Sequence, residues 1–160
     1  MPLVAVSPRA GAVGISWSFA HPPAAVWAAL TEPVSIGHWL GEVVECDLRP
    51  GGSLIVDHGE GYRSRSTVLE ADAPRRLAMT WEFPDEPASE VAFTLRASDD
   101  GTVLDLAHTG LDELVGSYRV GWITHLTYLE AVTDGVPLPA SQFWSLHETL
   151  DRGFARRDGD

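Results

Sequence analysis

The sequence predicts an α+β fold in which one antiparallel sheet is covered by a long helix near the C-terminus. Three observations lead to this prediction. Residues 13–20 alternate apolar and polar side chains, residues 43–109 contain several such segments separated by turns, and residues 110–133 carry apolar side chains three or four apart. Because the apolar face of a sheet must be buried, the helix of residues 110–133 is the element expected to cover it.

The length and composition of the chain fit one globular domain. With 160 residues, 44% of them hydrophobic and 21% charged, a single domain over residues 1–160 is expected, with its core at about 13–133. No stretch approaches the ~20 consecutive apolar residues of a membrane-spanning helix. Residues 1–14 lack the features of a secretory signal. The protein is therefore expected to be cytoplasmic, without membrane insertion.

The charge and the reactive side chains exclude several classes of function. The formal net charge of −12 disfavours binding to nucleic acid, and the basic residues, all arginines, are scattered along the chain. The lone Cys46 lies in an apolar strand, which predicts an inert thiol. Asp57 and His58 are adjacent, but neighbouring strand residues point to opposite faces, so they are not expected to act as an acid–base pair.

The first part of the chain is expected to form one strand and two helices. Residues 13–20 alternate as in a half-buried strand, with one face made of Val13, Ile15, Trp17 and Phe19. Pro22 and Pro23 suit the first turn of a helix, whose amide hydrogens lack partners in any case, and residues 24–31 continue it. A second short helix is expected at residues 33–40, and Trp27 of the first is assigned to the core.

Residues 43–109 are expected to form five or six antiparallel strands joined by hairpins. Turn sequences rich in Gly, Pro, Asp and Ser occur at 49–52, 58–61, 71–74, 83–89 and 98–101. The alternation of the last strand directs His108 inward if the strand stays regular. Arg63 and Arg65 are expected to point outward, because arginine is rarely buried without a partner.

Two helices are expected after the strands. Thr109 can cap the long helix, and Asp112 would lie in its first turn, where a carboxylate suits the helix dipole. A loop at residues 134–140 leads to an additional helix at 141–155, whose apolar face is Phe143, Leu146, His147, Leu150 and Phe154. This additional helix either packs on its own domain or mediates a homodimer.

Four stretches of the chain together resemble one family. They are HPPAAVWAALTEPVSIGHWLG (21–41), RPGGSLIV (49–56), STVLEADAPRRLAMTWEF (66–83), and LAHTGL followed by YRVGWITHLTYLE (106–130). In this order they resemble the SRPBCC, or START-like, superfamily, and within it the activator of Hsp90 ATPase homologue 1-like family. The resemblance implies a helix-grip (START-like, Bet v 1-like) fold of order β-α-α-β(5–6)-α plus an extra C-terminal helix, with a hydrophobic cavity between sheet and long helix.

The resemblance implies three alternative functions. The superfamily includes lipid and hormone binders, so the favoured function is binding of an apolar or aromatic small molecule in the cavity. It also includes aromatic polyketide cyclases, so a cyclase- or hydrolase-type enzyme in which His125 or His108 moves a proton is the first alternative. The second is a chaperone-related interaction. It is disfavoured because the eukaryotic Hsp90 activators have a further N-terminal domain that takes part in chaperone contact.

Seven residues are predicted to bind the ligand. Aromatic rings provide large apolar walls, and the tips of Trp and Tyr need a polar partner when buried. The set is Trp39, Trp81, Phe93, His108, Tyr118, Trp122 and His125. For the aromatic residues the alternative is a place in the core, for His108 it is a cap at the sheet edge, and for His125 it is a half-buried ring bonded to a backbone carbonyl. Gly116 and Gly121 predict that the long helix approaches the sheet closely or leaves room for a ligand.

No catalytic residue, cofactor or metal is assigned from the sequence. The six histidines show neither the spacing of a zinc motif nor a cysteine or carboxylate partner at ligand distance along the chain. The glycines at residues 51–52 belong to a hairpin turn rather than to a phosphate-binding loop.

Overall fold

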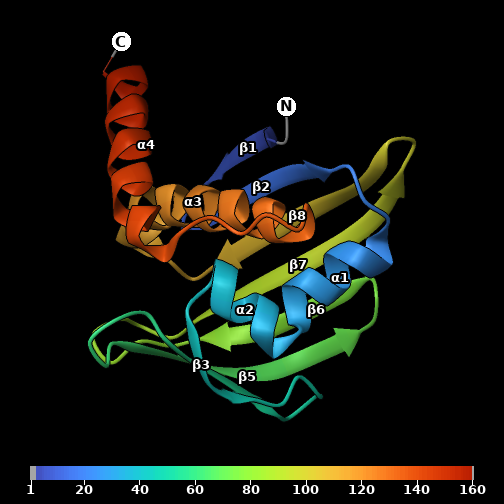
Figure 1. Cartoon of the computed structure of the whole chain (residues 1–160). Coiled ribbons are helices and arrows are strands. Elements are labelled where there is room, and N and C mark those ends of the chain that lie inside the picture. The colour runs from blue at the N-terminus through green and yellow to red at the C-terminus, as the bar shows by residue number, and fades with distance from the viewer. Residues whose placement is uncertain (1–2, 160) are drawn as a thin grey trace.

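Eight antiparallel strands form one sheet in the computed structural model, which describes residues 3–159 (Figure 1). The order of the strands across the sheet is β1-β2-β8-β7-β6-β5-β4-β3, so β1 and β3 lie at its two edges. The strands are β1 (Leu3–Arg9), β2 (Ala12–Phe19), β3 (Glu42–Cys46), β4 (Ser53–Asp57), β5 (Arg63–Asp72), β6 (Arg76–Trp81), β7 (Ser89–Ser98) and β8 (Gly101–Thr109).

Three helices cover one face of this sheet, and a fourth packs outside them (Figure 1). They are α1 (Pro23–Thr31), α2 (Pro33–Trp39), α3 (Val115–Thr133) and α4 (Phe143–Asp158). The order confirms the predicted β-α-α-β-α arrangement with an extra C-terminal helix, and six strands stand between α2 and α3. Among the described residues, no helix is long and apolar enough to cross a membrane.

The sequence analysis missed one strand, β1. It pairs antiparallel with β2 from Leu3 opposite Trp17 to Arg9 opposite Ala12. β1 contains Pro8, a residue that sheets accept mainly on edge strands because it cannot donate to the ladder. The proline disfavours a regular strand in this part of the sequence.

The long helix begins later than predicted. Thr109 ends β8 instead of capping a helix, and Gly110 follows with φ of +79°, a left-handed conformation that glycine adopts readily. Asp112 also has a positive φ, +48°, and starts a short 3-10 helix rather than the first turn of α3, which begins at Val115. The chain thus needs a sharp turn to bring α3 back across the sheet.

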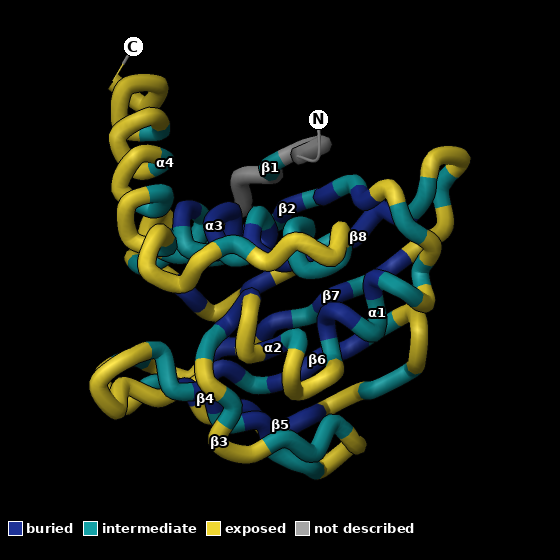
Figure 2. Tube along the Cα trace, in the orientation of Figure 1, coloured by how far each residue is buried: buried dark blue, intermediate teal, exposed yellow. Residues whose placement is uncertain are grey.

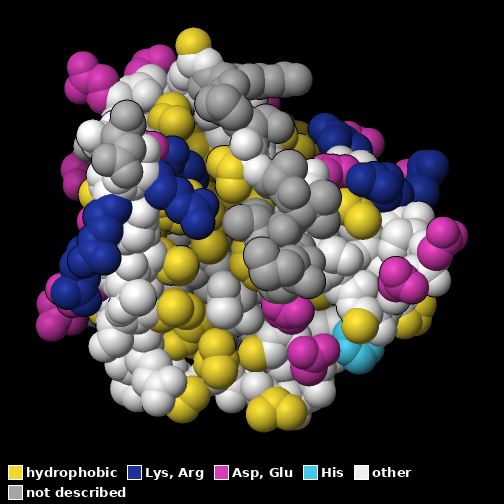
Figure 3. All heavy atoms as spheres, turned by 90° about the horizontal axis from the view of Figure 1, so that it is seen from above, with side chains coloured by type: hydrophobic (Ala, Val, Ile, Leu, Met, Phe, Trp, Pro, Cys, Tyr) yellow, Lys and Arg dark blue, Asp and Glu magenta, His cyan; other side chains and the backbone are white. Residues whose placement is uncertain are grey.

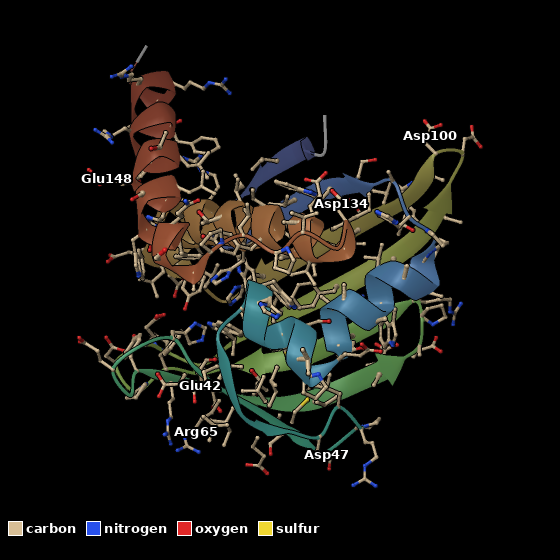
Figure 4. All side chains as sticks on the ribbon, viewed as in Figure 1. Glu42, Asp47, Arg65, Asp100, Asp134 and Glu148 are labelled. Carbon is tan, nitrogen blue, oxygen red and sulfur yellow. The ribbon has the colours of Figure 1, made fainter. Side chains whose placement is uncertain are left out.

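Burial alternates along the strands and places the core between sheet and helices (Figure 2). On β5, Ser64, Ser66 and Val68 face the helices and are almost fully buried. Arg63 and Arg65 alternate with them and are exposed, as predicted, and Arg65 points away from the body of the protein (Figure 4). Two serines therefore occupy covered positions where strands of this sheet otherwise carry mostly apolar residues.

The fourth helix lies against α3 and extends past the sheet (Figure 1). Its predicted apolar face is the half-buried one and packs on the core through Phe143, Leu146, Leu150 and Phe154. The Arg119 guanidinium lies 4.6 Å from the centre of the Phe154 ring and 2.9 Å from the Asp158 carboxylate. Basic side chains, among them Arg156 and Arg157 of its last turn, lie at the far end of this helix together with acidic ones (Figure 3). The homodimer alternative stays a prediction.

The two glycines of α3 do not mark a close approach to the sheet. A Cβ atom added at Gly116 or Gly121 would meet no neighbouring atom within 4 Å. Gly116 is exposed and Gly121 is half-buried. Of the two predicted alternatives, a close approach to the sheet is therefore wrong at these positions, and room for a ligand stays a prediction.

Candidate functional site

The structure brings the seven predicted site residues into one group, here called the interior cluster. Trp122 of α3 lies at its centre, with ring centroids 5.2 to 5.9 Å from those of Trp81, Phe93, His108 and His125. Trp39 of α2 packs edge-on against Phe93 at 6.2 Å, and Tyr118 packs against His108 at 4.7 Å. The cluster lies between the covered face of the sheet and helices α2 and α3.

His108 is held in a closed network of hydrogen bonds. The Trp122 indole N–H donates to Nδ1 of His108 over 2.9 Å, so the ring hydrogen of the neutral imidazole is on Nε2. Nε2–H then donates to the Ser89 hydroxyl at 2.7 Å, and this hydroxyl donates to the carbonyl of Trp81 at 3.2 Å. Burial lowers the pKa of His108 to about 4. Every polar atom of this ring has a partner, which suits a structural role.

His125 is a half-buried ring bonded to a backbone carbonyl. Its Nδ1–H donates to the carbonyl oxygen of Trp39 over 2.9 Å, so the lone pair is on Nε2. Burial lowers the pKa of His125 to about 4. Phe143 of α4 lies 4.7 Å from the His125 ring, so the additional helix covers this side of the cluster. His125 is therefore neutral at pH 7, with an acceptor atom rather than a charge.

His58 belongs to the interior cluster, although the sequence analysis did not select it. Its ring lies 5.9 Å from Trp81 and 6.3 Å from His125, and its Nε2 is 2.8 Å from the Ser64 hydroxyl. Burial lowers the pKa of His58 to about 4. Asp57 instead accepts from the backbone N–H of Gly59, so the two adjacent residues do not pair directly, as expected.

A sequence signal for His58 was available. Leu54 and Val56 of β4 are buried, and His58 continues this alternation two residues further on. The same rule that separates Asp57 from His58 therefore places His58 on the covered face. Its serine partner on the next strand could not be read from the sequence, because it depends on the register between β4 and β5.

Two tyrosine–carboxylate pairs, here called the latch, join the loops beside the cluster. Tyr118 of α3 accepts a bond of 3.0 Å from the Trp81 indole and donates to the Glu86 carboxylate. Tyr62 donates to Asp85 over 2.6 Å, and its ring stacks on Phe83 with centroids 4.5 Å apart. Burial, followed by the neighbouring carboxylate, raises the pKa of both tyrosines. The loop of residues 82–88 is thus tied both to α3 and to the chain after β4.

Two surface hollows are present elsewhere. One, of about 370 Å³, lies between α1 and the strands and is lined by Trp27, Thr31, Pro33, Cys46, Leu48, Ala71 and Ala73. The other, of about 300 Å³, lies at the turn between β3 and β4. Neither touches the interior cluster, whose rings pack against one another. Burial and the Asp47 carboxylate raise the pKa of the half-buried Cys46, which favours its unreactive thiol form.

No arrangement in residues 3–159 suits a metal ion. Among these residues, no three His, Cys, Asp or Glu side chains come together as ligands would. The histidines of the interior cluster instead bond to protein groups: His108 to Trp122 and Ser89, and His125 to a backbone carbonyl.

The sheet that wraps one long helix, with two short helices after its second strand, defines a helix-grip protein of the SRPBCC, START-like type. The model of the family described as "Activator of Hsp90 ATPase homolog 1-like protein" matches residues 20–134, and the chain belongs to this family. The first two strands, β1 and β2, and the last helix, α4, lie outside the matched residues.

Solved structures share this fold. CalU16 from Micromonospora echinospora is 28% identical with a TM-score of 0.75, over 91% of this chain and 86% of that one. MLL2253 from Mesorhizobium loti is 26% identical with a TM-score of 0.72, over 79% and 99% of the two chains. DynU16, a protein in the dynemicin biosynthetic locus, is 25% identical with a TM-score of 0.73, over 81% of this chain and 49% of that one. No curated protein matches the chain.

Proposed function

We propose that the protein binds an apolar or aromatic small molecule between the covered face of its sheet and α3. The observation that carries this proposal is the interior cluster, in which aromatic rings with polar tips and neutral histidines gather at one place in the core. Small-molecule sites combine such apolar walls with a few oriented polar groups. The similarity to DynU16, a protein of a biosynthetic locus, also supports a small-molecule ligand.

Binding in this place requires the rings to move apart, and the latch is the element that has to open. The loop of residues 82–88 is held to α3 through Tyr118 and Glu86, beside the Trp81 edge of the cluster. These bonds are partly buried, and each contributes on the order of 1 kcal/mol to stability, little enough for the loop to open. Opening of the latch would expose Trp81 and His58 first, since both contact Phe83 at the base of the loop.

Fluorine NMR of protein labelled with 5-fluorotryptophan tests the proposal. The chain has six tryptophans, and Trp-to-Phe substitutions, made one at a time, assign the fluorine resonance of each. Titration with tetralin, an uncharged bicyclic hydrocarbon, is expected to shift Trp39, Trp81 and Trp122. Trp144, which is 67% exposed on α4, and Trp27, at the outer hollow, are the internal controls. Shifts confined to Trp27 would place the ligand in the outer hollow and reject this site.

A second candidate function is hydrolysis of an activated ester, favoured by the His58–Ser64 pair. His58 Nε2 and the Ser64 hydroxyl are 2.8 Å apart, the separation of a base from the nucleophile it activates. His108 suits this role less, because the Trp122 bond to Nδ1 leaves the hydrogen on the nitrogen that faces Ser89. Turnover of p-nitrophenyl acetate that is lost in Ser64→Ala but kept in Ser89→Ala would support an enzyme; equal rates in both variants would reject it.

A further inference from the structure

Four buried side-chain atoms have no hydrogen-bond partner among the described residues: Trp17 Nε1, Trp39 Nε1, Ser66 Oγ and Arg119 Nε. Two of them, the indole N–H of Trp39 and the hydroxyl of Ser66, come from α2 and β5, and each belongs to a residue only 3% exposed. Most buried polar groups in proteins are paired, because an unpaired one loses its hydration without compensation. Two such donors beside one aromatic cluster therefore point to a group that arrives from outside the chain.

Both donors belong to side chains buried between the sheet and the helices that cover it. Ser66 lies on the covered face of β5, between the buried Ser64 and Val68. The Trp39 ring comes from α2 and lies edge-on to Phe93 at 6.2 Å and to His125 at 6.3 Å. One donor therefore reaches the interior from the sheet and the other from the helices that cover it.

The surroundings of these donors carry no positive charge. His58 and His125 are neutral at pH 7, because burial lowers the pKa of each to about 4. The arginines nearest in sequence, Arg63 and Arg65, are exposed on the opposite face of β5. A carboxylate placed here would be buried without a counter-ion, at a large free-energy cost. An uncharged acceptor would have no such penalty.

We propose that the ligand is an uncharged aromatic or alicyclic molecule carrying a carbonyl oxygen, which accepts hydrogen bonds from the Trp39 indole N–H and the Ser66 hydroxyl. This inference rests on the proposed binding function and adds the chemical class of the ligand. The rings of the cluster enclose the hydrocarbon part, and the two donors orient it by its oxygen.

A matched pair of probes tests whether the ligand carries a carbonyl oxygen. 1-Tetralone and tetralin have the same bicyclic frame and differ at the carbonyl, and 1-naphthoate adds a negative charge. With the fluorotryptophan protein, 1-tetralone is expected to bind about tenfold more tightly than tetralin, the ratio that two net hydrogen bonds provide. 1-Naphthoate is expected to bind more weakly than 1-tetralone. Equal affinities for 1-tetralone and tetralin would overturn the inference and leave the proposed function standing.

Variants assign the effect to the two donors. Ser66→Ala and Trp39→Phe are each expected to reduce the tetralone preference to about threefold, and the double variant to remove it. Ser145→Ala and Trp144→Phe, at exposed positions of α4, are the matched controls and should keep the full preference. A preference that survives in the double variant would overturn the assignment.

Two further outcomes are decisive. If no probe shifts any resonance of the interior cluster, the proposed function fails and the inference falls with it. Urea unfolding without ligand gives an independent answer, because replacing an unpartnered hydroxyl should leave the denaturation midpoint unchanged. A clear fall in the midpoint for Ser66→Ala would show that this hydroxyl is paired within the protein, against the inference.

Discussion

Two serine–histidine pairs lie in the same interior, and they differ in what surrounds them. His108 bonds to Ser89 and also receives the indole N–H of Trp122, so its network is complete. His58 bonds to Ser64, but two residues further along the same strand face the Ser66 hydroxyl has no partner. The His108–Ser89 pair is therefore a fully hydrogen-bonded part of the core, whereas the His58–Ser64 pair lies at the edge of a candidate site.

Residue type alone does not tell a structural serine–histidine pair from one in a candidate site. What distinguishes them is whether every buried polar group around the pair has a hydrogen-bond partner. A satisfied buried network stabilises a unique packing, and removing one member leaves the others unpaired. An incomplete one is a place where a ligand can add bonds without breaking any.

Removal of His108 should destabilise the protein far more than removal of His58. His108→Ala leaves the Trp122 indole N–H unpaired and takes from the Ser89 hydroxyl its donor, next to a new cavity, and is expected to lower the free energy of unfolding by about 4 kcal/mol. His58→Ala is expected to lower the free energy of unfolding by about 2 kcal/mol, since it leaves only the Ser64 hydroxyl without its partner. Urea unfolding monitored by circular dichroism measures both. Equal losses would mean that the two networks are equally integral to the core.

Acidification should weaken the folded state through the buried histidines. The pKa of His58, His108 and His125 is lowered to about 4 by burial, so the unfolded chain takes up protons below pH 6.5 that the folded chain does not. Stability is therefore fully present above pH 6.5 and is lost as the pH falls toward 4, by up to about 1.4 kcal/mol per pH unit for each histidine.

Urea unfolding at pH 7, 6 and 5 checks this slope. His58→Gln and His108→Gln should each reduce it by about one histidine's share, because each removes one proton from the difference between the two states. A slope unchanged by His58→Gln would show that His58 titrates in the folded protein as it does in the unfolded chain, and that its surroundings are open to water.

Substitution of Ser89 should destabilise the protein more than substitution of Ser66. Ser89→Ala leaves the Nε2–H of His108 without its acceptor and is expected to lose about 1 to 2 kcal/mol of unfolding free energy. Ser66→Ala removes a hydroxyl without a protein partner and is expected to change it by about 0.5 kcal/mol or less. Chemical denaturation of both variants under one condition gives the comparison. A larger loss of unfolding free energy for Ser66→Ala than for Ser89→Ala would contradict this prediction.

The latch should affect access more than stability. Tyr118→Phe leaves the Trp81 indole unpaired and is expected to lose about 1 kcal/mol, and Tyr62→Phe, at a 43% exposed residue, should lose less. In both variants tetralin is expected to associate faster, because the loop of residues 82–88 opens more easily. Stopped-flow fluorescence measures the association rate. An unchanged rate in both variants would place the path to the cluster elsewhere.

Patterns within single elements were readable from the sequence. The alternation of β8 predicted that His108 points inward, and it is fully buried. The spacing of residues 143–154 predicted which face of α4 packs on the domain. These predictions succeed because the side-chain periods of strands and helices are fixed by backbone geometry. The bounds of α3 were wrong at its start, because the turn at Gly110 depends on how the chain leaves the sheet.

Which groups meet across the fold was not readable in the same way. The sequence analysis named both His108 and His125 as candidates. In the structure His108 accepts a hydrogen bond from the Trp122 indole, and His125 donates one to the carbonyl of Trp39. For His58 the sequence shows its neighbour Asp57, but its partner Ser64 lies on the next strand. Hydrogen-bond partners far apart in the chain depend on strand register and on helix placement.

Hydrophobic periodicity is a local property, so the order of the elements from β2 to α4, the faces that they bury and the aromatic set under α3 could be predicted from the sequence. Which polar tips in that space are paired depends on the tertiary fold. The closed network of His108 and the unpartnered donors of Trp39 and Ser66 arise from contacts between β4, β5, β7, β8, α2 and α3. Such contacts form only when strand register and helix docking bring distant residues together.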